Sequence, residues 1–271
     1  MLSDRMKDAP ERGAPSNVRG WLSEVYLPAL VTSQEEQLVH RLGGRATVDD
    51  PIFGRASGMP ELEGYLHKAA AWLTERGATF EPQGFTTGSD RDVTEGLLTL
   101  TAEGRRIAVP IAVVAERRPE REVELRLYYS TKRLVAASHK RASLVPRQDE
   151  LPVPPVVAAH IEALARGDTD AVLASFENGA TLREPTGATH AKDPDGGAMR
   201  AFYDRLFISA PAGGRGLSMI KGSRADDGRT CAIEYTAARM RDGEVMPQPG
   251  LAVYERGESG LLRSVRLYHD Y

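Results

Sequence analysis

The sequence is poor in the features that mark secreted, membrane and nucleic-acid-binding proteins. Its one cysteine, Cys231, excludes a disulfide within the chain and fits a reducing compartment. No apolar run reaches the roughly 18 residues of a membrane-spanning helix, and residues 1–16 lack the apolar core of a signal peptide. The 35 basic and 38 acidic residues are interspersed, which leaves no basic stripe for phosphates. We therefore expect a cytoplasmic protein that binds neither membrane nor nucleic acid.

What the sequence has instead is an ordered series of periodic segments in its first half. Helical spacing covers about 18–30, and Ser33 and Glu36 form the pattern of a capping box that opens a short second helix. A strand-like segment then ends at Asp50, and a long helix is expected over about 60–76. Four strand-like runs complete the half, near 79–87, 92–102, 106–116 and 122–134.

The second half repeats this order after a proline-rich stretch. Tyr26 precedes Asp50 by 24 positions, and His160 precedes Glu184 by the same 24 positions. Two further segments match in the same order: Thr47–Pro51 with Thr181–Pro185, and Leu125–Tyr129 with Val265–His269. Several matches in one order predict a tandem duplication. The expected parts are a disordered leader at 1–16, a first domain at 17–138, a linker at 139–152 and a second domain at 153–271.

The order helix, short helix, strand, long helix and four strands resembles the nuclear transport factor 2-like superfamily. That superfamily includes ketosteroid isomerase, SnoaL-like polyketide cyclases and limonene-type epoxide hydrolases. The segment His160–Asp170 resembles its first helix and Gly-Asp turn, and Ala180–Pro185 resembles its first strand. The resemblance implies an α+β fold of two fused cone-shaped domains, each a curved antiparallel sheet wrapped around a long helix. The two sheets would pack against each other as a pseudo-dimer.

Each cone is expected to hold a pocket with apolar walls and a few inward polar groups. By the resemblance, Tyr26 and Asp50 occupy the positions of the oxyanion donor and the base of ketosteroid isomerase. A partly desolvated carboxylate has a raised pKa and can accept a proton, while a phenol can stabilise a developing enolate. Alternation along the strand should point Asp49 away from this pocket. The alternative for Asp50 is a turn residue that caps local backbone before Pro51.

The second half carries His160 and Glu184 at the same two positions. This pair could do acid–base work, or it could be buried and mutually satisfied. The second acid of ketosteroid isomerase would fall on Ala112 and near Ala252, which argues against steroid isomerisation. Aromatic residues of the two long helices are candidates for substrate binding, with packing as the alternative: Tyr65, Trp72, Phe202 and Tyr203.

Arg126 and Arg266 occupy matching places on the last strands of the two halves. They would either orient a catalytic carboxylate or lie on a solvated sheet face. The other histidines show no metal-ligand spacing, and no glycine-rich phosphate loop is present, so neither metal nor cofactor is predicted. These histidines are His40, His67, His139, His190 and His269.

The leading hypothesis is a cofactor-independent isomerase, cyclase or lyase of a small hydrophobic, carbonyl-bearing metabolite of the polyketide or terpenoid kind. Asp50 would be its base and Tyr26 its oxyanion donor. The alternatives are a non-catalytic small-molecule-binding module, an epoxide hydrolase/cyclase, and a structural role with collapsed pockets. An open cavity of about 300 Å³ or more would favour an enzyme or a binding module. The chain would be a monomeric pseudo-dimer or a dimer of it.

Overall fold

The computed structural model of the chain describes residues 18–43, 45–119, 122–135, 141–193, 197–208, 216–241 and 244–270. The expected leader at 1–16 and His139 lie outside these ranges. The first half contains α1 (Val18–Val31), α2 (Glu35–Leu42), β1 (Ala46–Asp50), β2 (Gly54–Ser57), α3 (Met59–Glu75), β3 (Thr79–Thr87), β4 (Arg91–Ala102), β5 (Arg105–Arg117) and β6 (Val123–Tyr129). The second contains α4 (Pro155–Arg166), α5 (Thr169–Ala174), β7 (Phe176–Arg183), β8 (Thr189–Ala191), α6 (Gly197–Ile208), β9 (Met219–Asp226), β10 (Thr230–Arg241), β11 (Glu244–Arg256) and β12 (Leu262–His269).

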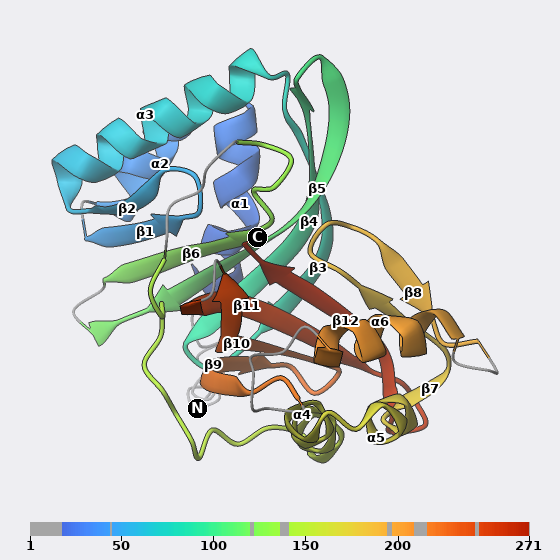
Figure 1. The fold of residues 1–271 in the computed structure, drawn as a ribbon. Coiled ribbons are helices and arrows are strands. Elements are labelled where there is room, and N and C mark those ends of the chain that lie inside the picture. Colours follow the sequence, from blue (N-terminus) through green and yellow to red (C-terminus); the bar gives the residue numbers. More distant parts are fainter. Residues whose placement is uncertain are drawn as a thin grey trace, which may run out of the picture.

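The two halves have the same sheet topology, which confirms the duplicated fold (Figure 1). The strand order is β2-β1-β6-β5-β4-β3 in the first sheet and β8-β7-β12-β11-β10-β9 in the second. Each position in the first order has its counterpart in the second. No helix among the described residues combines the length and the apolar character needed to cross a membrane.

The four long strands of each half pair antiparallel, as expected, but the first strand joins them in parallel, so both sheets are mixed. In the first sheet β1 runs parallel to β6, with Val48 opposite Leu125, and in the second β7 runs parallel to β12, with Leu182 opposite Val265. After the long helix the chain enters the sheet at its far edge and returns strand by strand to β1. The short edge strands β2 and β8, which pair antiparallel with β1 and β7, were also missed. They are four and three residues long, too short to show alternation.

The capping box predicted at Ser33 does not form. Helix α2 begins at Glu35 with Gln34 as its N-cap residue, and no side chain caps it. Ser33 has a positive φ of 53° in the turn after α1, and its hydroxyl shares a hydrogen bond of 3.0 Å with the Thr74 hydroxyl of α3. The side chain is therefore used to join two helices rather than to start one.

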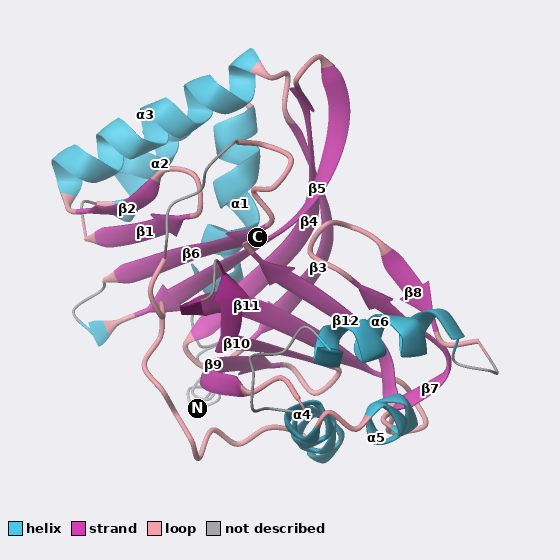
Figure 2. Ribbon diagram, viewed as in Figure 1, coloured by secondary structure: helices cyan, strands magenta, loops and turns pink. Residues whose placement is uncertain are grey.

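Each sheet buries one face under its own helices. On β6, Leu125, Leu127 and Tyr129 belong to the core of the first half, whereas Tyr128 on the alternate face belongs to a separate apolar cluster. That cluster joins strand residues of both sheets, including Val114 of β5 and Val253 of β11. The sheets thus pack face to face, as the resemblance implied, and the helices of the two halves lie on the outer sides (Figure 2).

Two matching polar clusters are buried between the sheets. Arg126 of β6 makes a bidentate contact with Glu234 of β10, at 2.5 and 2.7 Å, and the Tyr128 hydroxyl donates to Glu234 at 2.7 Å. The second half contributes the reciprocal cluster. There Arg266 of β12 contacts Glu95 of β4 at 2.7 and 2.9 Å, and the Tyr268 hydroxyl donates to Glu95 at 2.7 Å. Both clusters cross from one half to the other, which identifies this face as an internal two-fold interface.

These clusters correct both expectations for Arg126 and Arg266. Neither lies on a solvated face, since Arg126 is fully buried and the side chain of Arg266 is 19% exposed, and neither points into a cone. A buried guanidinium must be paired, and a bidentate carboxylate on the facing sheet pairs it in one register only. The clusters therefore specify how the two sheets align.

We expect Glu234→Gln to destabilise the fold by about 3 kcal/mol, because the buried Arg126 loses its bidentate carboxylate on the facing sheet and keeps only the acidic partners of its own half. Burial alone raises the pKa of Glu234, but the charge and hydrogen bonds of Arg126 and the hydroxyls of Ser223 and Tyr128 lower it to about 2. This stabilisation is complete above about pH 4.5 and is lost as the pH falls towards 2. Urea unfolding at several pH values measures it.

The matched control is Glu258→Gln, at an exposed residue of the second half. An equal free energy of unfolding for Glu234→Gln and Glu258→Gln would contradict the structural role of the interface clusters.

Candidate functional site

The first cone contains a fully bonded polar network around Asp50. The carboxylate lies at the end of β1 and accepts the backbone N–H groups of Ile52 and Phe53 at 2.7 and 3.0 Å. It also accepts the Tyr129 hydroxyl at 2.9 Å and the Tyr65 hydroxyl at 3.2 Å. Because the Tyr65 proton is used on Asp50, Tyr26 donates to Tyr65 in their 2.8 Å contact. The structure thus links Tyr26 to Asp50 through Tyr65 rather than directly.

Burial perturbs every member of this network. It raises the pKa of Asp50, against the lowering effect of the backbone N–H groups of Phe53 and Ile52 and of the Tyr129 hydroxyl. It also raises the pKa values of Tyr26 and Tyr65 well above the ordinary range. The Asp50 carboxylate therefore has the raised pKa expected of a base. It already accepts four hydrogen bonds from groups of the protein, however.

The space beside Asp50 is nearly filled. The cavity there has a volume of about 20 Å³, which is room for about one water molecule. Tyr65 and Trp72 line it, as the sequence predicted for the pocket, and Phe53 fills the space between them with edge-on contacts at 5.9 and 6.0 Å. The catalytic roles of Asp50 and Tyr26 remain predictions, and this conformation leaves no room for a substrate beside them.

Asp49 lies on the opposite side of β1, as strand alternation predicted. Its carboxylate accepts Arg141 Nη1 at 2.9 Å. Arg141, in the segment between the halves, also contacts Asp270 at 3.0 and 3.1 Å and the Leu127 carbonyl at 2.9 Å. One buried arginine therefore joins the connecting segment to both halves.

The second cone is open where the first is filled. It holds a cavity of about 180 Å³ whose walls include Leu206, Leu267 and Tyr254 together with the predicted residues His160, Phe202 and Tyr203. Gln248 and His269 complete its polar lining, and none of the described lining residues is Asp, Glu, Lys or Arg. The cavity is smaller than the 300 Å³ that would favour an enzyme or a binding module by size alone, and it has room for a single substituted ring.

The repeat places a glycine at the position of Phe53. The offset of 134 that relates Asp50 to Glu184 also relates Phe53 to Gly187. Gly187 does not line the second cavity, and a Cβ atom there would lie 3.6 Å from Pro110 of β5. The second half thus has no aromatic ring at this position of the repeat.

Glu184 and His160 are not brought together. Glu184 contacts His190 Nε2 at 2.5 Å, and His190 comes from β8, the edge strand that the sequence did not reveal. His160 instead contacts Ser175 Oγ through Nδ1 at 2.9 Å, and its ring lies edge-on to Phe176 and Tyr254 at 5.3 and 5.6 Å. The predicted His–Glu pair is thus replaced by two separate contacts, only one of which faces the cavity.

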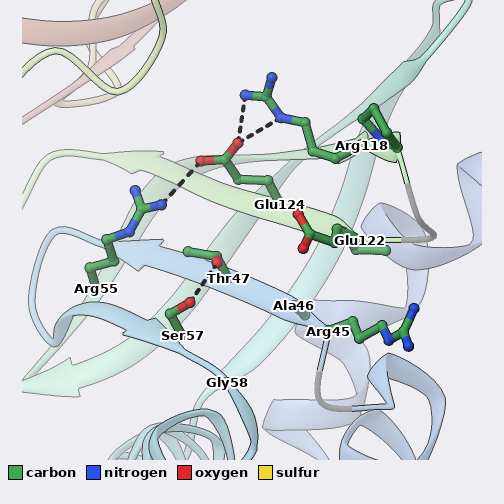
Figure 3. A pocket seen from close by; sticks show the side chains of 11 residues that line it. Arg45, Ala46, Thr47, Arg55, Ser57, Gly58, Arg118, Glu122 and Glu124 are labelled. Carbon is green, nitrogen blue, oxygen red and sulfur yellow. Dashed lines mark hydrogen bonds and ion pairs between the residues drawn. The ribbon is translucent and has the colours of Figure 1, made fainter.

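A larger but more polar groove of about 660 Å³ crosses the ends of β1, β2 and β6 (Figure 3). Arg118 donates twice to Glu124, at 3.1 and 2.7 Å, and Arg55 lies 3.7 Å from the same carboxylate. The Thr47 and Ser57 hydroxyls bond each other at 3.0 Å. Because these groups satisfy one another at the surface, we take the enclosed cavity of the second cone as the candidate site. Within the described ranges, no group of three or more His, Cys, Asp or Glu side chains is arranged to hold a metal ion.

No protein-family model matches the sequence, and no curated protein matches it. Similar solved structures include an NTF2-like protein of unknown function from Cytophaga hutchinsonii, at 13% identity and a TM-score of 0.34, covering 45% of this chain and 95% of its own. An LEH-like epoxide hydrolase from M. tuberculosis has 19% identity and a TM-score of 0.36, covering 43% and 81%. The epoxide hydrolase/cyclase-like enzyme SalBIII of salinomycin pyran-ring formation has 20% identity and a TM-score of 0.35, covering 42% and 87%. The fold itself rests on the strand order of the two sheets.

We expect Asp50→Asn to lower the free energy of unfolding by about 1–3 kcal/mol, because the amide nitrogen cannot accept the hydrogen bonds that one carboxylate oxygen now accepts. Denaturant unfolding measures the change. Asp149→Asn is the control, since the Asp149 side chain is 68% exposed and its ion pair with Arg147 is a surface one. Equal stability of the two variants would show that Asp50 is not part of the packed framework.

Proposed function

We propose that the second half binds one small, mainly apolar molecule in its cone, and that the first half is its packed structural partner. The observation that carries the proposal is the contrast between the two cones. One has a volume of about 180 Å³ with aromatic and aliphatic walls, whereas the other is filled down to about 20 Å³. An engineered apolar cavity of about 150 Å³ is enough to bind benzene, so the larger one can take a ring with a small substituent.

The acid–base hypothesis requires a carboxylate base and room for a substrate in the same cone, and the structure has them in different cones. A carboxylate base needs room for a substrate, yet the buried carboxylate Asp50 lies in the filled cone. The open cone has no carboxylate among its described lining residues. Binding without proton abstraction therefore has the stronger support, and the isomerase, cyclase and epoxide-opening hypotheses have no comparable observation behind them.

Toluene is a suitable probe, because it is apolar and of the right size. We expect saturable binding with a Kd of about 1 mM or tighter. NMR of ¹³C-labelled methionine methyl groups shows where toluene binds, because Met219 lines the cavity whereas Met59 lies exposed in the first half. The Met219 signal should shift and the Met59 signal should not.

A pair of neighbouring variants tests the location. Ala237→Leu fills the cavity and should weaken toluene binding by at least about tenfold through overpacking. Ala238→Leu is the matched control, since its side chain points to the other face of β10. No saturable shift at Met219, or a loss of binding in Ala238→Leu but not in Ala237→Leu, would overturn the proposed function.

A further inference from the structure

The hydrogen bonds behind His160 determine which of its ring nitrogens carries the proton. The Ser175 hydroxyl donates to the Val172 carbonyl at 2.6 Å, so its single hydrogen is not available to the imidazole. The 2.9 Å contact between His160 Nδ1 and Ser175 Oγ is therefore one in which Nδ1–H donates. In the neutral ring Nε2 is then the bare nitrogen, which can only accept a hydrogen bond.

The surroundings keep this imidazole neutral. Burial among aromatic rings lowers the pKa of His160 to about 3. The other imidazole of the lining is His269, and the described lining contains no Asp, Glu, Lys or Arg. A charged ligand would lose its hydration here without gaining a counter-charge. The cavity is therefore suited to an uncharged molecule.

Polar atoms of three lining residues have no hydrogen-bond partner within the described part of the chain. His160 Nε2 and the hydroxyls of Tyr203 and Tyr254 make no hydrogen bond to any other described residue, although each of these residues is at most 2% exposed. Buried polar groups normally find a partner. A hydroxyl can donate or accept, but the bare Nε2 can be satisfied only by a donor.

We infer that the cavity is selective for a neutral molecule that carries a hydroxyl group on a small apolar body, such as a phenol or an alcohol. The hydroxyl donates to His160 Nε2 and accepts from a tyrosine hydroxyl. Ser175 is a positioning residue, because its bond to Val172 is what forces the proton onto Nδ1. This inference rests on the proposed binding function and adds the chemical class of the ligand.

The test compares phenol with toluene, which have the same shape and differ in the donor. Phenol is better hydrated than toluene, so the readout is the phenol-to-toluene affinity ratio in each variant rather than either affinity alone. His160→Asn keeps an N–H donor towards Ser175 and removes the acceptor, and we expect the ratio to fall by about tenfold. Benzaldehyde, which only accepts, and benzoate, which is charged, should both bind more weakly than phenol.

¹⁵N NMR of the imidazole reads the tautomer directly in the unaltered protein. We expect a proton on Nδ1 and none on Nε2. In Ser175→Ala the ring loses the partner that fixes it, so the Nε2–H form should become populated and the phenol-to-toluene ratio should fall. Ser218→Ala, at an exposed serine of the same half, is the control and should change neither quantity.

The outcomes separate the two proposals. Absence of toluene binding would overturn the proposed function itself. Toluene binding with an unchanged ratio in His160→Asn, or an Nε2–H tautomer in the unaltered protein, would overturn the selectivity for a hydroxyl donor and leave the binding function standing.

Discussion

The face-to-face contact of the two sheets is the constraint on which the rest of the structure depends. Each sheet has an apolar helix-covered face and a second face that carries a buried Arg-x-Tyr pair on its last strand, Arg126 with Tyr128 and Arg266 with Tyr268. Once such a face is covered, its guanidinium and hydroxyl groups need partners, and a purely apolar layer would not supply them. Each arginine also has an acidic partner in its own half, but the carboxylate that it contacts in a bidentate manner, Glu234 or Glu95, comes from the facing sheet. The fused duplication supplies both partners in one chain, which leaves both cones on the outer sides.

Within that shared framework the two cones have diverged in opposite directions. The first retains a carboxylate, Asp50, but surrounds it with donors and fills the remaining space with Phe53. The second has Gly187 at the matching position and keeps the space, while its carboxylate Glu184 turns to His190. Packing density makes the first arrangement a stabilising core. The second leaves buried polar atoms that have no hydrogen-bond partner among the described residues.

The sequence predicted what depends on periodicity and repetition. The duplication follows from matched spacing, and the opposite directions of Asp49 and Asp50 follow from strand alternation. The α+β class and the sheet-to-sheet packing came from the family resemblance. It did not predict the parallel pairing of β1 with β6, because these strands lie far apart in the sequence and local spacing does not show which strands pair. It missed β2 because four residues are too few to show a pattern. It also misplaced Arg126, because its partner Glu234 comes from the other half of the chain. It misplaced Glu184, because its partner His190 lies on a short strand that the sequence did not reveal. Local sequence patterns do not show which residues far apart in the chain will pair.

The central claim is that one cone, and only that one, receives a small hydroxylated ligand. A crystal structure of the protein with 4-bromophenol tests it most directly, because the anomalous signal of bromine locates the ring without prior assumptions. The account predicts one bromine site in the cone of the second half, with the phenol oxygen at hydrogen-bond distance from His160 Nε2 and beside the Tyr203 or Tyr254 hydroxyl. A bromine site beside Asp50 in the first cone, or a ring in the second cone with its hydroxyl turned away from His160, would contradict it.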